Sequence, residues 1–160
     1  MHEWDTFAVV LGGSAGALVG LLFVAMSIHA GRISGSADLR NRAAQTLVVF
    51  ATLLLVALLL SIPLQPDWLL GAELLVLAMS VGIVLVVLDR RAGHSSSRSP
   101  IARTLQTVNP STLTAVGVAS TGVLMLCGLD WADFVLVPTA CAAMVGGLAS
   151  AFLLLTKLTD

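Results

Sequence analysis

The sequence predicts an all-α membrane protein, a single transmembrane domain over residues 1–160 built as a bundle of five helices. Its 160 residues are 58% apolar and 11% charged, whereas soluble domains are roughly 45–50% apolar and about 25% charged. The mean hydropathy is +1.00. The apolar residues gather in five runs, each close to the length of about 20 residues that crosses a bilayer as a helix. These observations exclude a water-soluble globular protein.

The first predicted span covers residues 6–30. Residues 2–5, which precede it, are acidic rather than basic, so we expect a retained helix and not a cleaved secretory signal peptide. Gly and Ser residues between positions 31 and 36 favour a turn-rich loop. Asp38 is then the expected N-cap of the second helix, because its carboxylate can accept hydrogen bonds from free backbone N–H groups.

Two prolines, Pro63 and Pro66, separate the second predicted span, residues 43–63, from the third, residues 68–88. Proline cannot continue a helix beyond its first turn, and the connection between the spans has room only for a tight turn. We therefore expect these two helices to pack against each other as an antiparallel hairpin.

The remaining predicted segments are a cytoplasmic loop, residues 89–110, and two spans, residues 111–129 and 134–156. Apolar residues at helical spacing between 101 and 108 predict a short amphipathic helix at the membrane surface. Pro110 is favourably placed at the first helical position, directly before the fourth span. Pro138 predicts a kink near the outer end of the fifth span.

The charged residues predict how the bundle is oriented. All eight basic residues fall on one side of the five-span arrangement: Arg32, Arg40, Arg42, Arg90, Arg91, Arg98, Arg103 and Lys157. Because basic loops remain in the cytoplasm, the N-terminus is predicted outside and the C-terminus in the cytoplasm. The three tryptophans, Trp4, Trp68 and Trp131, all fall at the opposite boundary, where indole rings prefer to lie.

Glycines form the most regular pattern in the chain. Gly12, Gly16 and Gly20 recur every four residues, a spacing that advances only about 40° around a helix and so makes one slowly turning groove. The fifth span has a similar small-residue stripe around Gly147. Small residues let two helix backbones approach closely in lipid. The stripe therefore predicts either packing of the first span against the fifth or contact with another subunit, including a pore-facing role.

Two polar residues within the spans are candidates for an ion or proton site. Glu73 is the only acidic residue inside a predicted span, and Ser80 shares its helix face. Intramembrane acids are often functional, but Glu73 lies near the outer boundary, where a solvated or capping role is also open. His29, near the cytoplasmic end of the first span, could sense pH or serve only as a polar residue at the interface.

No enzymatic, cofactor or metal site is predicted. Residues 12–16 match the G-x-S-x-G pattern of serine hydrolases, but that motif requires a strand-to-helix turn and a nearby histidine. Cys127 and Cys141 lie in apolar runs and are expected to be small buried hydrophobic residues.

The stretches AGALVGLLFVAMSIHA (residues 15–30), LRNRAAQTLVVF (residues 39–50) and SIPLQP (residues 61–66) resemble a family of small bacterial integral membrane proteins. Some of its members carry an automatic label as modulators of the membrane protease FtsH. The resemblance covers about the first 66 residues and rests on apolar and small residues. It implies location in a bacterial plasma membrane. No motif in the sequence corresponds to the protease label.

The expected function is therefore that of a non-enzymatic membrane protein, which acts through helix packing as an accessory, assembly or regulatory subunit. A small homo-oligomeric ion channel or transporter is the alternative. The expected partners are the lipid bilayer and either a second copy or another membrane protein, with no nucleic acid. A channel needs a continuous lining across the bilayer, whereas the middle of the predicted spans is almost wholly apolar.

Overall fold

The computed structural model describes residues 2–92, 110–129 and 131–159, and these residues form helices and their connections without a strand. The helices are α1 (His2–Ile28), α2 (Ala30–Gly35), α3 (Ala37–Leu60), α4 (Asp67–Ala92), α6 (Pro110–Leu126), the 3-10 helix η1 (Ala132–Val135) and α7 (Leu136–Thr159). The predicted amphipathic helix at 101–108 lies outside the described residues.

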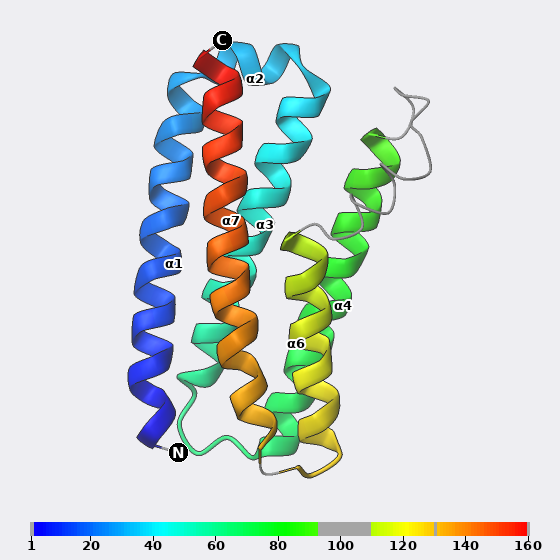
Figure 1. Ribbon diagram of the computed structural model, residues 1–160. Helices are drawn as coiled ribbons and strands as arrows, with labels where there is room; N and C mark the ends of the chain where they lie inside the picture. Colours follow the sequence, from blue (N-terminus) through cyan, green and yellow to red (C-terminus); the bar gives the residue numbers. More distant parts are fainter. Residues whose placement is uncertain (1, 93–109, 130, 160) are drawn as a thin grey trace.

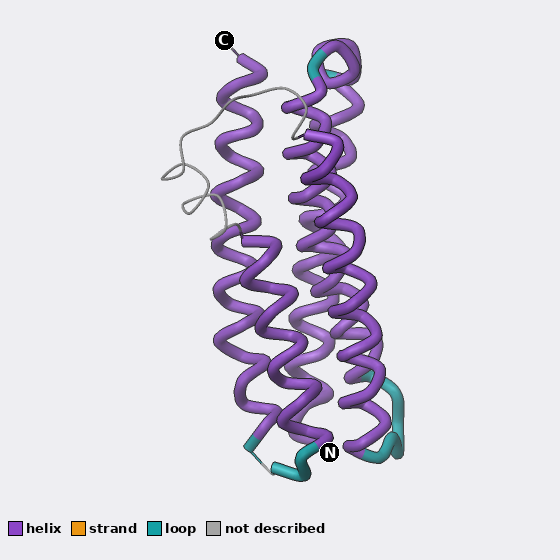
Figure 2. Tube along the Cα trace, turned by 90° about the vertical axis from the view of Figure 1, so that its right-hand side faces the viewer, coloured by secondary structure: helices purple, strands orange, loops and turns teal. Residues whose placement is uncertain are grey.

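The long helices α1, α3, α4, α6 and α7 run alternately up and down in an elongated bundle, and the two chain termini lie at opposite ends (Figure 1). Figure 2 shows that the helices also stay close to parallel in the perpendicular view. Among the described residues, four helical segments are long and apolar enough to cross a membrane, as expected of a membrane protein: Trp4–Ile28, Leu39–Leu60, Asp67–Leu88 and Ala132–Thr156.

Helix α3 is central, because it packs against α1, α7 and α4. The core includes Phe50, Leu53 and Val56 of α3 together with Leu74 of α4 and Leu136 at the start of α7. Side chains of apolar residues on the outer surfaces of the helices are exposed, which suits contact with lipid acyl chains.

Helix α6 is shorter than the predicted span at 111–129. It has 17 residues and rises about 25 Å, less than the roughly 30 Å of a hydrocarbon core. It ends at Leu126, and Gly128 then takes a φ of 72°, a left-handed conformation that glycine adopts without strain. Pro110, its first residue, lies against Gly146 near the middle of α7. Helix α6 therefore accompanies only part of the length of α7.

The predicted loop at 31–36 is wrong, because residues 31–35 belong to the short helix α2 and only Ser36 lies between helices. The chain breaks at His29 (φ −105°, ψ 21°) and resumes helical structure at once. Ile33 is buried against Ala43 and Leu154, and this burial outweighs the turn preference of the glycines and serines. Ser36, not Asp38, is the N-cap of α3, since its Oγ accepts a hydrogen bond from the Leu39 backbone N–H at 3.5 Å.

Helix α3 stops before the two prolines, as their missing N–H groups predict, but it ends at Leu60, three residues short of the predicted boundary at 63. Helices α3 and α4 do contact each other, but they are not the closest pair: α4 packs more extensively on α6, and α3 on α1. Gly71 and Gly122 explain the close α4–α6 contact. A Cβ added at Gly122 would lie 2.8 Å from the carbonyl oxygen of Gly71. A Cβ added at Gly71 would lie 3.0 Å from the carbonyl oxygen of Gly122.

Pro138 does not interrupt the interior of a helix. It is the third residue of α7 and follows η1 directly. The N–H groups of a first helical turn have no intrahelical partner, so the missing donor of Pro138 removes no bond from the body of α7. A kink was expected at Pro138. The structure instead changes from 3-10 helix to α-helix two residues earlier, between Val135 and Leu136.

Candidate functional site

The fold separates the interfacial residues into two ends. At one end, here the tryptophan end, lie Trp4 at the start of α1, Trp68 at the start of α4 and Trp131 in the α6–α7 connection. At the other, here the arginine end, lie Arg40 and Arg42 at the start of α3 and Arg90 near the end of α4. The predicted separation in space therefore holds for the three tryptophans and for these three arginines; Arg98 and Arg103 lie outside the described residues.

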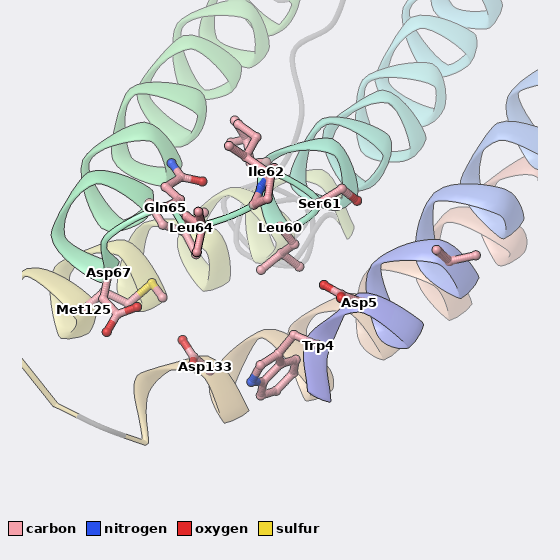
Figure 3. A pocket seen from close by; sticks show the side chains of 14 residues that line it. Trp4, Asp5, Leu60, Ser61, Ile62, Leu64, Gln65, Asp67, Met125 and Asp133 are labelled. Carbon is pink, nitrogen blue, oxygen red and sulfur yellow. The ribbon is translucent and has the colours of Figure 1, made fainter. Parts of the chain in front are cut away.

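A cavity of about 430 Å³ opens at the tryptophan end (Figure 3). It lies between the start of α1, the α3–α4 connection, the start of α4 and η1. Its lining residues are Trp4, Asp5, Val9, Leu59, Leu60, Ser61, Ile62, Pro63, Leu64, Gln65, Asp67, Leu70, Met125 and Asp133. The volume falls in the range of about 300–1,000 Å³ that is usual for small-molecule sites.

Three carboxylates line this cavity, each from a different part of the chain: Asp5 from α1, Asp67 from the start of α4 and Asp133 from η1. No lining residue is basic. Figure 3 shows Asp67 and Asp133 on facing sides, with Trp4 next to Asp133. The Trp4 ring makes edge contacts with Phe7 and Phe134, both with ring centroids 5.6 Å apart, and these contacts hold the indole in place.

Gln65 connects this cavity to the predicted candidate Glu73. The Gln65 Nε2 donates a hydrogen bond of 2.6 Å to Glu73 Oε2, which ties the α3–α4 connection to α4. Gln65 is only 8% exposed, and its Oε1 is buried without a hydrogen-bond partner in the described structure. Glu73 itself is half-buried and does not line the cavity.

Ser80 is not brought together with Glu73 in a shared site. It is exposed, and its Oγ donates a hydrogen bond of 2.7 Å to the Leu77 carbonyl of its own helix. His29 lies at the break between α1 and α2, at the arginine end. Its Nδ1 is 3.1 Å from the Ala25 carbonyl oxygen, a contact that requires the proton on Nδ1. His29 therefore satisfies a carbonyl near the helix end.

The four glycines of the predicted packing stripe have different surroundings. A Cβ at Gly12 would lie 3.2 Å from Ala57 Cβ, and one at Gly16 would lie 3.5 Å from Leu54 Cδ1, both on α3. Gly20 has no neighbour within 4 Å of such an atom. Gly147 also faces α3, where a Cβ would lie 2.8 Å from the Phe50 ring.

The first span was predicted to pack against the fifth, which is α7. This prediction is wrong, because α1 packs mainly on α3 and makes few contacts with α7. The cysteine prediction is also wrong: Cys127 and Cys141 are both exposed. Both cysteines lie on the outside of the bundle. A small apolar side chain is compatible with contact with lipid there, just as it would be with a buried position.

Within the described ranges, no three His, Cys, Asp or Glu side chains are grouped closely enough to hold a metal ion. The three carboxylates of the cavity are consequently a dispersed set of charges rather than a ligand cluster. From the sequence, Asp67 and Asp133 are predicted only as residues of tight turns. One feature of the sequence does indicate that acidic side chains gather at this end: the N-terminal segment and both predicted outer connections contain acidic residues but no lysine or arginine.

Comparison with known proteins gives no match: no protein-family model, no curated protein and no solved structure is detectably similar to this chain.

Proposed function

We propose that this protein is a non-enzymatic component of a bacterial plasma membrane, which acts through helix packing as an accessory, assembly or regulatory subunit and associates through α1. The observation that supports this most directly is the outer face of α1. Gly13, Ala17 and Gly20 are all exposed there. Apart from the adjoining residues and the backbone of α1 itself, no atom of the described protein lies within 4 Å of a Cβ added at Gly13 or Gly20.

Helix geometry explains why these residues form one face. Successive steps of four residues advance about 40°, so the glycine stripe turns away from α3 between Gly12 and Gly20. Gly13, Ala17 and Gly20 fall within about 60° of one another on the far side. A face of small residues leaves a shallow groove in which a second helix can reach van der Waals contact, the main attraction between helices in lipid.

The alternative, a channel, has less support from the interior of the bundle. Four buried threonine hydroxyls bond to carbonyl oxygens of their own helices: Thr46 to Arg42, Thr52 to Val48, Thr114 to Pro110 and Thr121 to Gly117. Hydroxyls satisfied in this way do not offer a continuous polar path. A conducting assembly would need a path between several copies.

The proposal includes a topology of five passes with the N-terminus outside and the C-terminus in the cytoplasm. It is supported by the positions of the termini at opposite ends of the bundle (Figure 1) and by the separation of tryptophans from arginines, which matches the positive-inside rule and the preference of indole for the interface.

Reporter fusions test this topology. Green fluorescent protein, which folds to its fluorescent form in the cytoplasm, is expected to fluoresce when fused after Asp160. Alkaline phosphatase, which is active outside the cytoplasm, is expected to be inactive there. Fusion after Leu64, two passes into the chain, should reverse both signals. If α6 did not cross, the chain ends would lie on the same side, and an active phosphatase after Asp160 would rule out five passes.

The association test replaces Gly20 by leucine. Leucine would fill the groove on the free face of α1, so we expect the complex seen by native mass spectrometry in mild detergent to lose its partner chain. Gly82→Leu is the matched control, because Gly82 in α4 also has no neighbour within 4 Å and its replacement should leave the complex intact. A complex that survives Gly20→Leu, or a wild-type protein that is monomeric, would contradict association through α1.

A further inference from the structure

The connection between α3 and α4, residues 61–66, places its polar and apolar side chains in the opposite way from a loop that faces water. Gln65 is 8% exposed, and the Ser61 Oγ donates a hydrogen bond of 2.8 Å back to a carbonyl oxygen of α3. Leu64, in contrast, is 93% exposed and Ile62 is 46% exposed. In water-soluble proteins glutamine is mostly exposed and leucine mostly buried. The connection is therefore built for apolar surroundings.

The backbone conformation of Leu64 is unusual as well. Among the described residues, Leu64 is the only residue other than glycine with a positive φ, at 58°. In this left-handed conformation the Cβ of an L-residue lies too close to the following carbonyl oxygen, so turns in water usually place Gly, Asn or Asp there. A leucine held outward at such a position is favourable only where its side chain leaves water for other apolar groups.

The backbone of the connection has few hydrogen-bond donors left to satisfy. Its two prolines have no N–H group, and the N–H groups of Ser61 and Ile62 donate to carbonyl oxygens of α3. Leu64 and Gln65 are then the two residues of the connection whose N–H groups have no acceptor among the described residues. Unsatisfied N–H groups are costly in hydrocarbon. A short segment with so few of them can lie close to acyl chains.

The length of α3 places the connection at the boundary of the hydrocarbon core. Arg40 lies at the arginine end, and Leu60, the last residue of α3, follows it after about 30 Å of helix. This length equals the thickness of a typical hydrocarbon core. Trp68, just beyond the connection, is 63% exposed, as suits an indole at the interface. The exposed side chains of Ile62 and Leu64 are therefore within reach of the acyl chains.

We propose that the α3–α4 connection is inserted into the lipid leaflet at the tryptophan end, with Ile62 and Leu64 against the acyl chains and Gln65 turned back into the bundle. Lipid is the occupant that fits this surface. Exposed aromatic side chains at the same end also come from α4, from the α6–α7 connection and from η1, and a surrounding bilayer contacts all of them at once. The inserted connection fixes the depth of the bundle in the membrane at this end.

The test attaches the fluorophore NBD to Leu64→Cys, in full-length protein whose Cys127 and Cys141 are replaced by alanine. All three parent side chains are exposed, so these changes remove no core packing. The protein is held in phosphatidylcholine nanodiscs, with a nitroxide lipid as the membrane quencher and iodide as the aqueous quencher. We expect a blue-shifted emission, loss of iodide quenching relative to the free dye, and stronger quenching by a nitroxide near the headgroup than by one deep in the acyl chain.

Ile62→Cys, whose φ is not positive, should give the same pattern if the left-handed turn at Leu64 relaxes. Val76→Cys, on the 69% exposed outer face of α4, is the reference for a deeper label and should respond more to the deep nitroxide. Efficient iodide quenching at 62 and 64 would overturn the proposal, because the connection would then lie in water. Protection from both quenchers would overturn it too, since protein would then cover the connection. Gly20→Leu should change none of these results, which keeps them separate from association through α1.

Discussion

Replacing Gly122 by alanine is expected to destabilise the bundle by about 3 kcal/mol, the upper part of the range for overpacked interiors. The added methyl would lie 2.8 Å from the Gly71 carbonyl oxygen and 2.9 Å from Leu75 Cγ. A backbone oxygen cannot turn aside as a flexible side chain can, so α4 and α6 must separate. Titration with a denaturing detergent, followed by circular dichroism, should show the loss of helix at a lower detergent fraction.

Gly82→Ala is the control for this effect. Apart from the adjoining residues and the backbone of α4 itself, no atom of the described residues lies within 4 Å of a Cβ at Gly82, and alanine is a better helix former than glycine by about 0.5–1 kcal/mol. The Gly82 variant should therefore be as stable as the parent protein or slightly more so. Equal losses for both variants would show that the α4–α6 contact has no special role.

The presence of the long helices could be predicted because a membrane span depends mainly on the residues within it. A run of about 20 apolar residues is sufficient for it, and Pro63 and Pro110 mark helix ends through their missing N–H groups. The α2 segment shows the limit. Its glycines and serines favour a turn locally, but burial of Ile33 against Leu154, which lies far away in the sequence, decides its conformation.

Helix partners were not predictable to the same degree. The glycine stripe of α1 correctly indicates a close approach, yet small residues on α3 and α7 satisfy the same pattern, and the stripe cannot distinguish them. The position of Ala57 opposite Gly12 depends on how α1 and α3 are rotated about their axes. That rotation results from packing throughout the bundle and has no signature in one helix alone.

The cavity illustrates the same limit for the site. The sequence places Trp4, Asp67 and Asp133 at one membrane boundary, which the structure confirms as one end of the bundle. It does not reveal that the α3–α4 connection leaves a space among them. The sequence also could not predict that Gln65 Oε1 lacks a hydrogen-bond partner. Whether an oxygen is paired depends on the positions of the surrounding groups in the folded protein.

Phe50→Ala is expected to cost about 3 kcal/mol, near the lower end of the range for phenylalanine deletion in a core. The side chain is 1% exposed, and its ring fills the space that the missing side chain of Gly147 leaves on α7. In a membrane the released ring surface would meet lipid rather than water, so the loss comes mainly from van der Waals packing. Detergent titration measures it against Phe23→Ala, whose parent side chain is 54% exposed and whose loss should change stability little.

The pairing of Phe50 with Gly147 can be tested separately from the stability of the bundle. Gly147→Ala alone should be destabilising, because its methyl would lie 2.8 Å from two ring carbons. In the Phe50→Ala background the same change meets an empty space, so its effect should largely disappear. Contacting residues are non-additive in this manner, whereas distant ones add. Additive losses would mean that α7 does not pack on α3 through this pair, and the central place of α3 in the bundle would have to rest on other contacts.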